Sequence, residues 1–215
     1  MSGGVVIASP LPWEIRDYGQ TDYTPMWQAM REFTDHRDAE TRDECWLTQH
    51  APVYTLGLNI RPENLPLNDS IPVVETDRGG QITYHGPGQF IVYILLDLRR
   101  RRLAVKELVS RFEQGTITFL SHLGIEAHLN PGAPGVYVNG AKIASLGLKI
   151  RRGCTYHGLS LNADMDLTPF EWIRPCGYEG LRVTQLHDHG VNQLSMPILH
   201  QQLAKTLLDT IDRPT

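Results

Sequence analysis

The sequence predicts an α/β (α+β) fold in which helices flank a mixed, largely antiparallel sheet. Apolar residues recur at helical spacing over 24–36, 105–123 and 191–211. Between residues 125 and 164 the pattern changes to short apolar strands separated by turn dipeptides, as in an antiparallel meander. A chain of 215 residues can bury a substantial core without disulfides. We therefore expect a single domain over 1–215, with its core from about 12 to 212.

Composition excludes several classes of function. The net charge of −4 argues against a general nucleic-acid binder, which needs an excess of Lys and Arg. The longest apolar run, over 90–96, falls far short of the ~20 residues that span a bilayer. The first twelve residues do not read as a signal peptide, and the three cysteines show no CxxC spacing. We expect a soluble, cytoplasmic protein with reduced thiols that binds neither nucleic acid nor membrane.

The first third of the chain reads as short strands around one helix. The helix over 24–36 carries Met26, Trp27, Met30 and Phe33 on one face. Strands are predicted over 13–18, 45–49 and 71–76, with an extended segment over 50–57 that ends in a turn and a proline-rich connecting loop over 59–72. Cys45 reads as a packed apolar side chain.

Residues 78–98 combine a glycine-rich loop with the most apolar stretch of the chain. Gly79, Gly80, Gly86 and Gly88 permit close approach of a ligand to the backbone, and the strand over 90–96 reads as covered on both faces. This stretch is either a binding loop mounted on a core strand or a purely structural hairpin. The arginines 99–102 that follow read as a solvated turn or as a docking patch for an acidic partner.

The second half begins with a long helix over 105–123, which Gly115 weakens and Gly124 ends. A hairpin over 136–143 is the clearest in the sequence. Residues 166–174 read as a short helix or turns, and 175–177 as a tight bend. The last helix lies within 191–211, with Leu194, Ile198, Leu203 and Leu207 expected to point inward.

Cys176 differs from the other cysteines because Pro175 and Gly177 place it on a constrained bend. It is either an inert residue or a nucleophile, and a nucleophile needs an activator because the thiolate is the reactive form. The candidate activators are His85, His157, His187, His189 and Lys142. The apolar neighbours of Lys142 disfavour its charged form, so it can act as a base.

A metal site is not predicted. His187 and His189 flank Asp188, but two histidines without a third ligand at suitable spacing read as a solvated loop.

Five motifs occur in order between residues 50 and 184: HAPVYTLG (50–57), RGGQITYHGPGQ (78–89), GAKIASLG (140–147), HGLSLN (157–162), and PCG (175–177) followed by VT (183–184). Together they resemble the lipoyl(octanoyl) transferase family of the biotin/lipoate protein ligase superfamily. One departure is visible: Ile94 follows Tyr93 where the family pattern usually has proline.

The resemblance implies a biotin/lipoate protein ligase-like fold, here as one catalytic domain. It implies an acyltransferase of lipoate biosynthesis that needs no cofactor. Such an enzyme takes an octanoyl group from octanoyl-acyl carrier protein. It delivers the group to a lysine of the lipoyl domains of 2-oxoacid dehydrogenase complexes and of glycine cleavage H protein.

The resemblance also implies a role for particular residues. Cys176 would carry the acyl thioester and Lys142 would activate it as a base. The acyl-binding segments would be Arg78, Gly79, Gly80, Gln81, Ile82, Thr83, Tyr84 and His85; Ser145, Leu146 and Gly147; and Gly158, Leu159 and Ser160.

Three other functions remain open at this point. An ATP-dependent lipoate-protein ligase would keep the fold, activate a free acid as an adenylate and need no acyl-cysteine. A hydrolase would pass the acyl group from Cys176 to water. A non-catalytic binder would dock carrier protein or lipoyl domains through residues 99–102 and the glycine loop.

Overall fold

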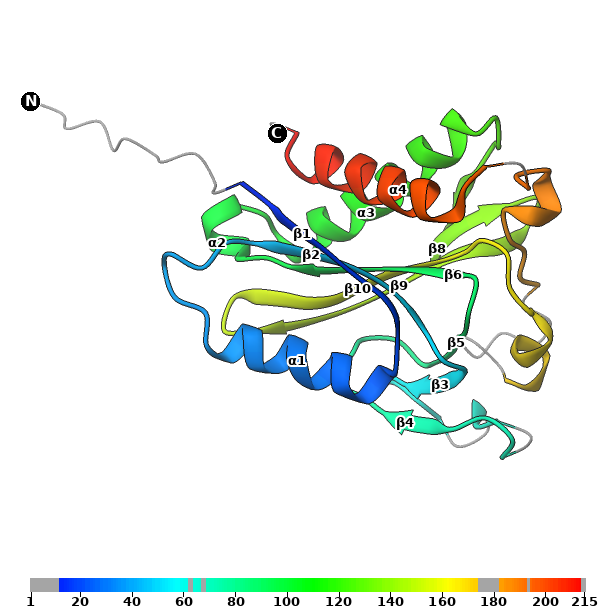
Figure 1. The fold of residues 1–215 in the computed structure, drawn as a ribbon, viewed down its shortest axis with the longest axis horizontal. Coiled ribbons are helices and arrows are strands. Elements are labelled where there is room, and N and C mark those ends of the chain that lie inside the picture. Colours follow the sequence, from blue (N-terminus) through cyan, green and yellow to red (C-terminus); the bar gives the residue numbers. More distant parts are fainter. Residues whose placement is uncertain (1–11, 62–63, 67–68, 174–181, 193, 214–215) are drawn as a thin grey trace, which may run out of the picture.

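The protein folds around a seven-stranded sheet with helices on both faces (Figure 1). The computed structural model describes residues 12–61, 64–66, 69–173, 182–192 and 194–213. The helices are α1 (Tyr23–Asp35), α2 (Leu98–Arg101), α3 (Val105–His122) and α4 (Met196–Ile211), with 3-10 helices η2 (Thr168–Trp172) and η4 (His187–His189). The strands are β1 (Glu14–Thr21), β2 (Glu44–His50), β3 (Val53–Leu56), β4 (Val73–Glu75), β5 (Ile82–His85), β6 (Gln89–Leu95), β7 (His128–Asn130), β8 (Ala133–Val138), β9 (Ala141–Arg151) and β10 (Cys154–Asn162).

The large sheet has the order β1-β2-β6-β10-β9-β8-β7. Among the described strands of this sheet, β1 and β2 pair in parallel and the other neighbouring pairs are antiparallel. A smaller sheet, β4-β3-β5, lies beside it. The predicted fold class, a mixed and largely antiparallel sheet with flanking helices, is confirmed.

The continuous apolar run of strand β6 is explained by the cores on its two faces. Phe90, Val92 and Ile94 join the core beneath α3 and α4, whereas Ile91 and Tyr93 join the core beneath α1. Because successive strand residues face opposite sides, a strand covered on both faces must be apolar at every position. The prediction for this strand is confirmed, and β6 lies inside the sheet between β2 and β10.

The meander over β7–β10 also forms as predicted. Asn139 and Gly140, which connect β8 to β9, both have positive φ angles, of 50° and 75°. Such a turn matches the twist of a hairpin. Helix α3 runs unbroken through Gly115, which is buried against Leu207 of α4.

The inward face predicted for the last helix is partly wrong. Leu194 precedes the helix and is 53% exposed, and Ile198 is 55% exposed. Leu203 and Leu207 are buried as predicted, and Leu199 takes the inward position expected of Ile198. Ile198 lies about 100° around the helix from Leu199, so a shift of one residue moves it from the core to the surface.

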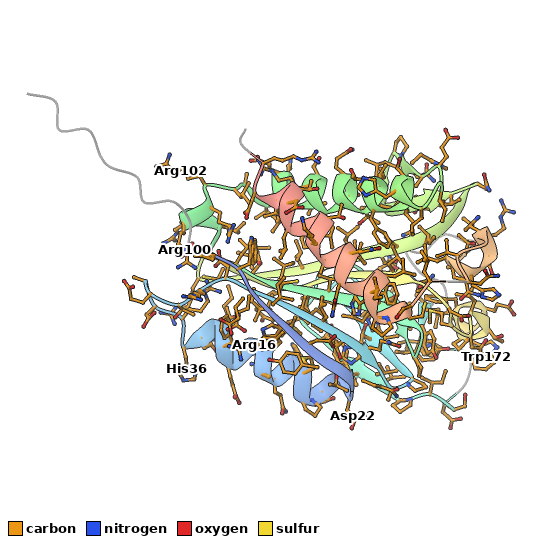
Figure 2. The ribbon with its side chains drawn as sticks, turned by 45° about the horizontal axis from the view of Figure 1, so that its top comes forward. Arg16, Asp22, His36, Arg100, Arg102 and Trp172 are labelled. Carbon is orange, nitrogen blue, oxygen red and sulfur yellow. The ribbon has the colours of Figure 1, made fainter. Side chains whose placement is uncertain are left out.

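The arginine run is largely structural rather than a free docking patch. Arg100 and Arg101 both donate to the fully buried carboxylate of Asp43, at 2.6 and 2.5 Å, and Arg37 joins them at 2.5 Å. Figure 2 shows Arg100 and Arg102 at the end of the molecule opposite Trp172. The docking interpretation is therefore wrong for Arg100 and Arg101, because their guanidinium groups form ion pairs with the buried Asp43 carboxylate.

The structure also bears on three further expectations from the sequence. Residues 168–172 form the short helix η2, and His187 lies in the short helix η4 with its side chain half exposed. No helix within the described ranges is long and apolar enough to cross a membrane. The bend at 175–177, with Cys176, lies outside the described residues.

Candidate active site

A cavity of about 550 Å³ opens between the 78–83 loop and strands β9 and β10. Pockets for small molecules typically measure about 300–1,000 Å³. Its walls are mostly apolar, with a few polar side chains that include Lys142, Arg78 and His157. A cavity of this size and lining suits a largely apolar small ligand with a few polar contacts.

Four small residues form part of the floor of the cavity. Ser145 lies directly opposite Ser160, and Gly147 lies directly opposite Gly158, across the β9–β10 pair. Since cross-strand partners share a face of the sheet, these positions make one flat patch without large side chains. A β-carbon on Gly147 would lie 3.2 Å from both Arg78 Cδ and Gly79 O, so a larger residue would narrow the gap beneath the loop.

The loop above this floor is held by backbone and side-chain hydrogen bonds. Arg78 is buried and donates through Nε to Thr55 Oγ1 at 3.0 Å. The Gly79 amide donates to the Leu148 carbonyl of β9 at 2.9 Å, and the Asn59 amide donates to the Gly80 carbonyl at 3.0 Å. The glycine stretch is therefore a fixed wall of the cavity, which favours the binding-loop interpretation over the structural hairpin.

Lys142 is 4% exposed and lies in the cavity wall at the start of β9. Its Nζ donates to the Pro134 carbonyl at 2.9 Å and lies 5.3 Å from the centre of the Tyr137 ring. The Lys142 backbone also bridges to Val183, because its amide donates to Arg182 O at 2.8 Å and its carbonyl accepts from Thr184 N at 3.0 Å. The chain that follows residues 174–181 thus returns to Lys142.

One side of the cavity is built from aromatic and imidazole rings. Tyr23 stacks on His85 with 5.8 Å between ring centres, and Tyr93 contacts His157 edge-on at 6.2 Å. Burial lowers the pKa of His85 well below its usual value, and burial is also the main reason that the pKa of His157 is lowered. Burial raises the pKa of Tyr23 to about 12. This wall is therefore uncharged near neutral pH.

Asp77 orients His157. The His157 Nε2 lies 3.0 Å from Asp77 Oδ1, and the same carboxylate accepts from Trp27 Nε1 at 2.9 Å and from the Tyr156 hydroxyl. Burial acts to raise the pKa of Asp77, but these three donors outweigh it and the net shift is downward. The carboxylate therefore stays ionised and holds the proton of neutral His157 on Nε2.

A chain of buried hydrogen bonds crosses the core behind this wall. His85 Nδ1 lies 2.7 Å from Gln89 Oε1, Gln89 Nε2 donates to Asn162 Oδ1 at 2.9 Å, and Asn162 Nδ2 donates to Thr184 O at 3.0 Å. Thr184 is the residue whose amide binds the Lys142 carbonyl. Four of the sequence motifs thus meet in one connected network.

Apart from Tyr84, every residue predicted to bind the acyl group lines the cavity. These are Arg78, Gly79, Gly80, Gln81, Ile82, Thr83, His85, Ser145, Leu146, Gly147, Gly158, Leu159 and Ser160. The Tyr84 ring packs against Tyr54 and Phe170, with 5.6 and 5.5 Å between ring centres. Tyr84 faces the opposite side of β5 from Thr83 and His85 because strand residues alternate.

The sequence did not point to several lining residues, namely Tyr23, Asn59, Ile91, Tyr93, Val105, Val109, Gly132, Ala133, Pro134, Leu148 and Ile150. Most of them lie on elements that read as ordinary core or loop. For Tyr93 the sequence held one sign of a role in the site, namely a hydroxyl group within an otherwise apolar strand. Its hydroxyl lies 2.7 Å from His50 Nε2.

The two cysteines within the described part of the chain are poor nucleophiles. Cys45 is fully buried, and burial raises the pKa of its thiol to about 12. Burial also raises the pKa of Cys154. Among the residues that the structure describes, no group of His, Cys, Asp and Glu is arranged to hold a metal ion. His189, one of the candidate ligands, lies 3.0 Å from Thr184 Oγ1.

Comparison with solved structures shows which folds this one resembles. A putative lipoate protein ligase from T. acidophilum with bound lipoic acid matches with a TM-score of 0.73 and 16% identity, covering 94% of this chain and 86% of that one. Biotin protein ligase from Aquifex aeolicus, in complex with biotin and ATP, matches with a TM-score of 0.55 and 11% identity, covering 95% and 71%. At such identities the likeness concerns the fold alone.

Sequence comparison is more specific. Residues 22–208 match the family model of the lipoyl protein ligase A/B catalytic domain. The octanoyltransferase of Chromobacterium violaceum is 59% identical over 182 residues, which cover 85% of this chain and 88% of that protein. The octanoyltransferase of Laribacter hongkongensis is 54% identical over 200 residues, covering 93% and 96%. The chain therefore belongs to the lipoyl protein ligase A/B catalytic-domain family, and within it to the octanoyltransferases.

Proposed function

We propose that this enzyme moves an octanoyl group from octanoyl-acyl carrier protein to a lysine of apo lipoyl domains through a thioester on Cys176. The observation that carries the proposal is the setting of Lys142. This lysine is buried in the wall of an apolar cavity and is bridged to the segment 182–184, which follows the segment of Cys176.

The reaction is a pair of acyl transfers. In the first, Lys142 takes the proton of Cys176, and the thiolate attacks the thioester carbonyl of the donor. The pantetheine sulfur leaves and takes up a proton, so one thioester replaces another and the step is nearly balanced in energy. In the second, the uncharged amine of the acceptor lysine attacks the acyl-cysteine and an amide forms, while the Cys176 sulfur leaves and takes up the proton that the amine loses. Splitting the transfer in this way is covalent catalysis.

The cavity supplies the binding energy for the acyl chain. The chain would lie on the floor made by Ser145, Gly147, Gly158 and Ser160, under the 78–83 loop. Each buried methylene contributes up to ~0.8 kcal/mol. The reaction needs a reduced thiol, which agrees with a cytoplasmic location.

The acceptors would be the lipoyl domains of 2-oxoacid dehydrogenase complexes and glycine cleavage H protein. The rival reaction, ATP-dependent ligation of free acid, is less well supported because the close relatives are octanoyltransferases. The two reactions differ in one testable way: the transferase needs no ATP and forms an acyl-enzyme.

Intact-protein mass spectrometry tests the proposal. The enzyme is mixed with octanoyl-acyl carrier protein without ATP, beside Cys176→Ala and Lys142→Ala. We expect the parent to gain one octanoyl mass and to lose it when an apo lipoyl domain is added, which becomes octanoylated. Cys176→Ala should gain none, and Lys142→Ala should gain it far more slowly.

Three outcomes would contradict the proposal. Acceptor modification that requires ATP and free octanoate, without an adduct on the enzyme, would establish a ligase. Loss of the adduct to water at the same rate with and without the acceptor would establish a hydrolase. A binder would show no adduct and would keep its affinity in Cys176→Ala.

A further inference from the structure

Gly135, in the middle of β8, lies against the side chain of Lys142. A β-carbon built on Gly135 would lie 3.2 Å from Lys142 Cε and 3.5 Å from Cδ. It would also lie 2.6 Å from the carbonyl oxygen of Ala144 on the paired strand β9. Real β-carbons are not found that close to a backbone oxygen, so any residue other than glycine would displace β8 from β9 or push the lysine aside.

Residues on either side of Gly135 contact the amino group of the same lysine. The Pro134 carbonyl accepts the hydrogen bond from Nζ at 2.9 Å, and the Tyr137 ring lies 5.3 Å from it. We call residues 134–137 the lysine cradle. The cradle is itself anchored to helix α3, because the Gly135 amide donates to Glu113 Oε1 at 3.2 Å.

The backbone of Gly135 has a φ angle of +126°, and β8 and β9 shift register between Val136 and Tyr137. Beside this irregularity the Pro134 carbonyl accepts from Nζ, and the missing β-carbon of Gly135 leaves room for the lysine stem. The backbone of β8 at Gly135 is therefore shaped around the side chain of Lys142, which lies in the wall of the cavity.

We propose that Gly135 is a positioning residue for the acyl transfer, acting through Lys142. It places Nζ by leaving the space for its stem and by aiming the Pro134 carbonyl at it. This inference rests on the proposed role of Lys142 as the base that activates Cys176.

The test compares four proteins: the parent, Lys142→Ala, Gly135→Ala and the double variant. The pH dependence of alkylation of Cys176 by iodoacetamide is followed by peptide mass spectrometry, and octanoyl transfer is measured beside it. Cys45 and Cys154 are buried, so they will react slowly in the folded protein. Gly124→Ala is the matched control, since Gly124 also has positive φ (+76°) but nothing within 4 Å of its β-carbon position.

We expect Gly135→Ala to slow octanoyl transfer roughly a hundredfold, the usual consequence of misplacing a catalytic group by about 1 Å. We also expect its alkylation profile to move to higher pH, toward that of Lys142→Ala. The double variant should match Lys142→Ala, because Gly135 acts only through the lysine. Gly124→Ala should keep both the transfer rate and the profile of the parent.

The inference is overturned if Gly135→Ala keeps the parent's alkylation profile, or if its effect is undiminished in the Lys142→Ala background, as a general structural defect would be. If instead Lys142→Ala itself leaves transfer and profile unchanged, the role of Lys142 in the proposed function fails first. Should Gly135→Ala not fold, Glu113→Ala is compared in the same two backgrounds, because it releases the Gly135 amide without adding an atom to β8.

Discussion

At the scale of single residues, the small side chains of the cavity floor bound the space in which the proposed function places the acyl chain. Ser160 lies opposite Ser145 and lines the cavity. Ser160→Val replaces the hydroxyl with a methyl group and adds a second methyl group where the chain would lie, so we expect a fall of at least about tenfold in kcat/KM for the octanoyl donor, which corresponds to about 1.4 kcal/mol. A butyryl donor, which occupies less of the slot, should lose less. Steady-state kinetics with both donors measures the difference.

The matched control is Ser121→Val, because Ser121 is exposed on α3. It should leave both kcat/KM values within about twofold of the parent, because Ser121 does not line the cavity. An equal loss for both donors in Ser160→Val would mean that the residue does not limit the length of the slot.

At the scale of secondary-structure elements, the packing of α3 on α4 depends on Gly115. A β-carbon there would lie 3.0 Å from Leu207 Cδ2 and 3.3 Å from both Leu207 Cα and Thr210 Oγ1. Alanine improves helix propensity by up to ~1 kcal/mol, whereas overpacking a tight contact costs about 1–3 kcal/mol. We therefore expect Gly115→Ala to lower the free energy of unfolding by about 1 kcal/mol in urea titrations. A gain in stability would show that the two helices separate without cost.

At the scale of the whole molecule, Asp43 joins distant parts of the chain. Its buried carboxylate binds Arg37 beyond α1 and Arg100 and Arg101 of α2. Burial acts to raise the pKa of Asp43, but the arginines outweigh it and the net shift is downward. Breaking a buried ion pair leaves uncompensated charge and typically costs about 3–5 kcal/mol. We expect Asp43→Asn to lose that much stability in urea unfolding.

A surface ion pair provides the comparison for Asp43. Lys205 and Asp209 are exposed and one helical turn apart on α4. Asp209→Asn should cost no more than about 0.5 kcal/mol, because solvent screens such pairs. Similar losses in the two variants would mean that the Asp43 cluster is not a structural centre.

The whole fold should also weaken in mild acid because its buried histidines are neutral. Burial lowers the pKa of His50 to about 4, from about 6.5 when unfolded. Between these values the unfolded chain binds more protons than the folded one, so stability falls as pH decreases through this window. For His50 alone the loss by pH 5 is about 2 kcal/mol. Urea unfolding at pH 7.5 and 5 should show a smaller difference for His50→Gln than for the parent, and an unchanged difference would contradict this cause.

The sequence by itself determined the fold class, most element positions and the residues of the cavity loop and floor. Local patterns carry that information: the continuous apolar run of β6 requires two covered faces, and the Asn139-Gly140 dipeptide requires a tight hairpin. The motifs also pointed to Lys142, which lies in the cavity wall. No local pattern distinguished Leu199 from Ile198 as the buried residue, because the phase of a helix is set by the surface on which it packs.

Only the tertiary structure decided which residues act on one another across the chain. It turned Tyr84 into the core beside Phe170, and it brought Pro134 and Gly135 against Lys142. It also paired the arginine run with Asp43, which precedes Arg100 by 57 residues in the sequence. Such contacts join elements far apart in sequence, so their residues share no local spacing that a pattern could reveal. The physical reason is that side-chain periodicity encodes which face is buried, whereas strand order and register decide what lies against that face.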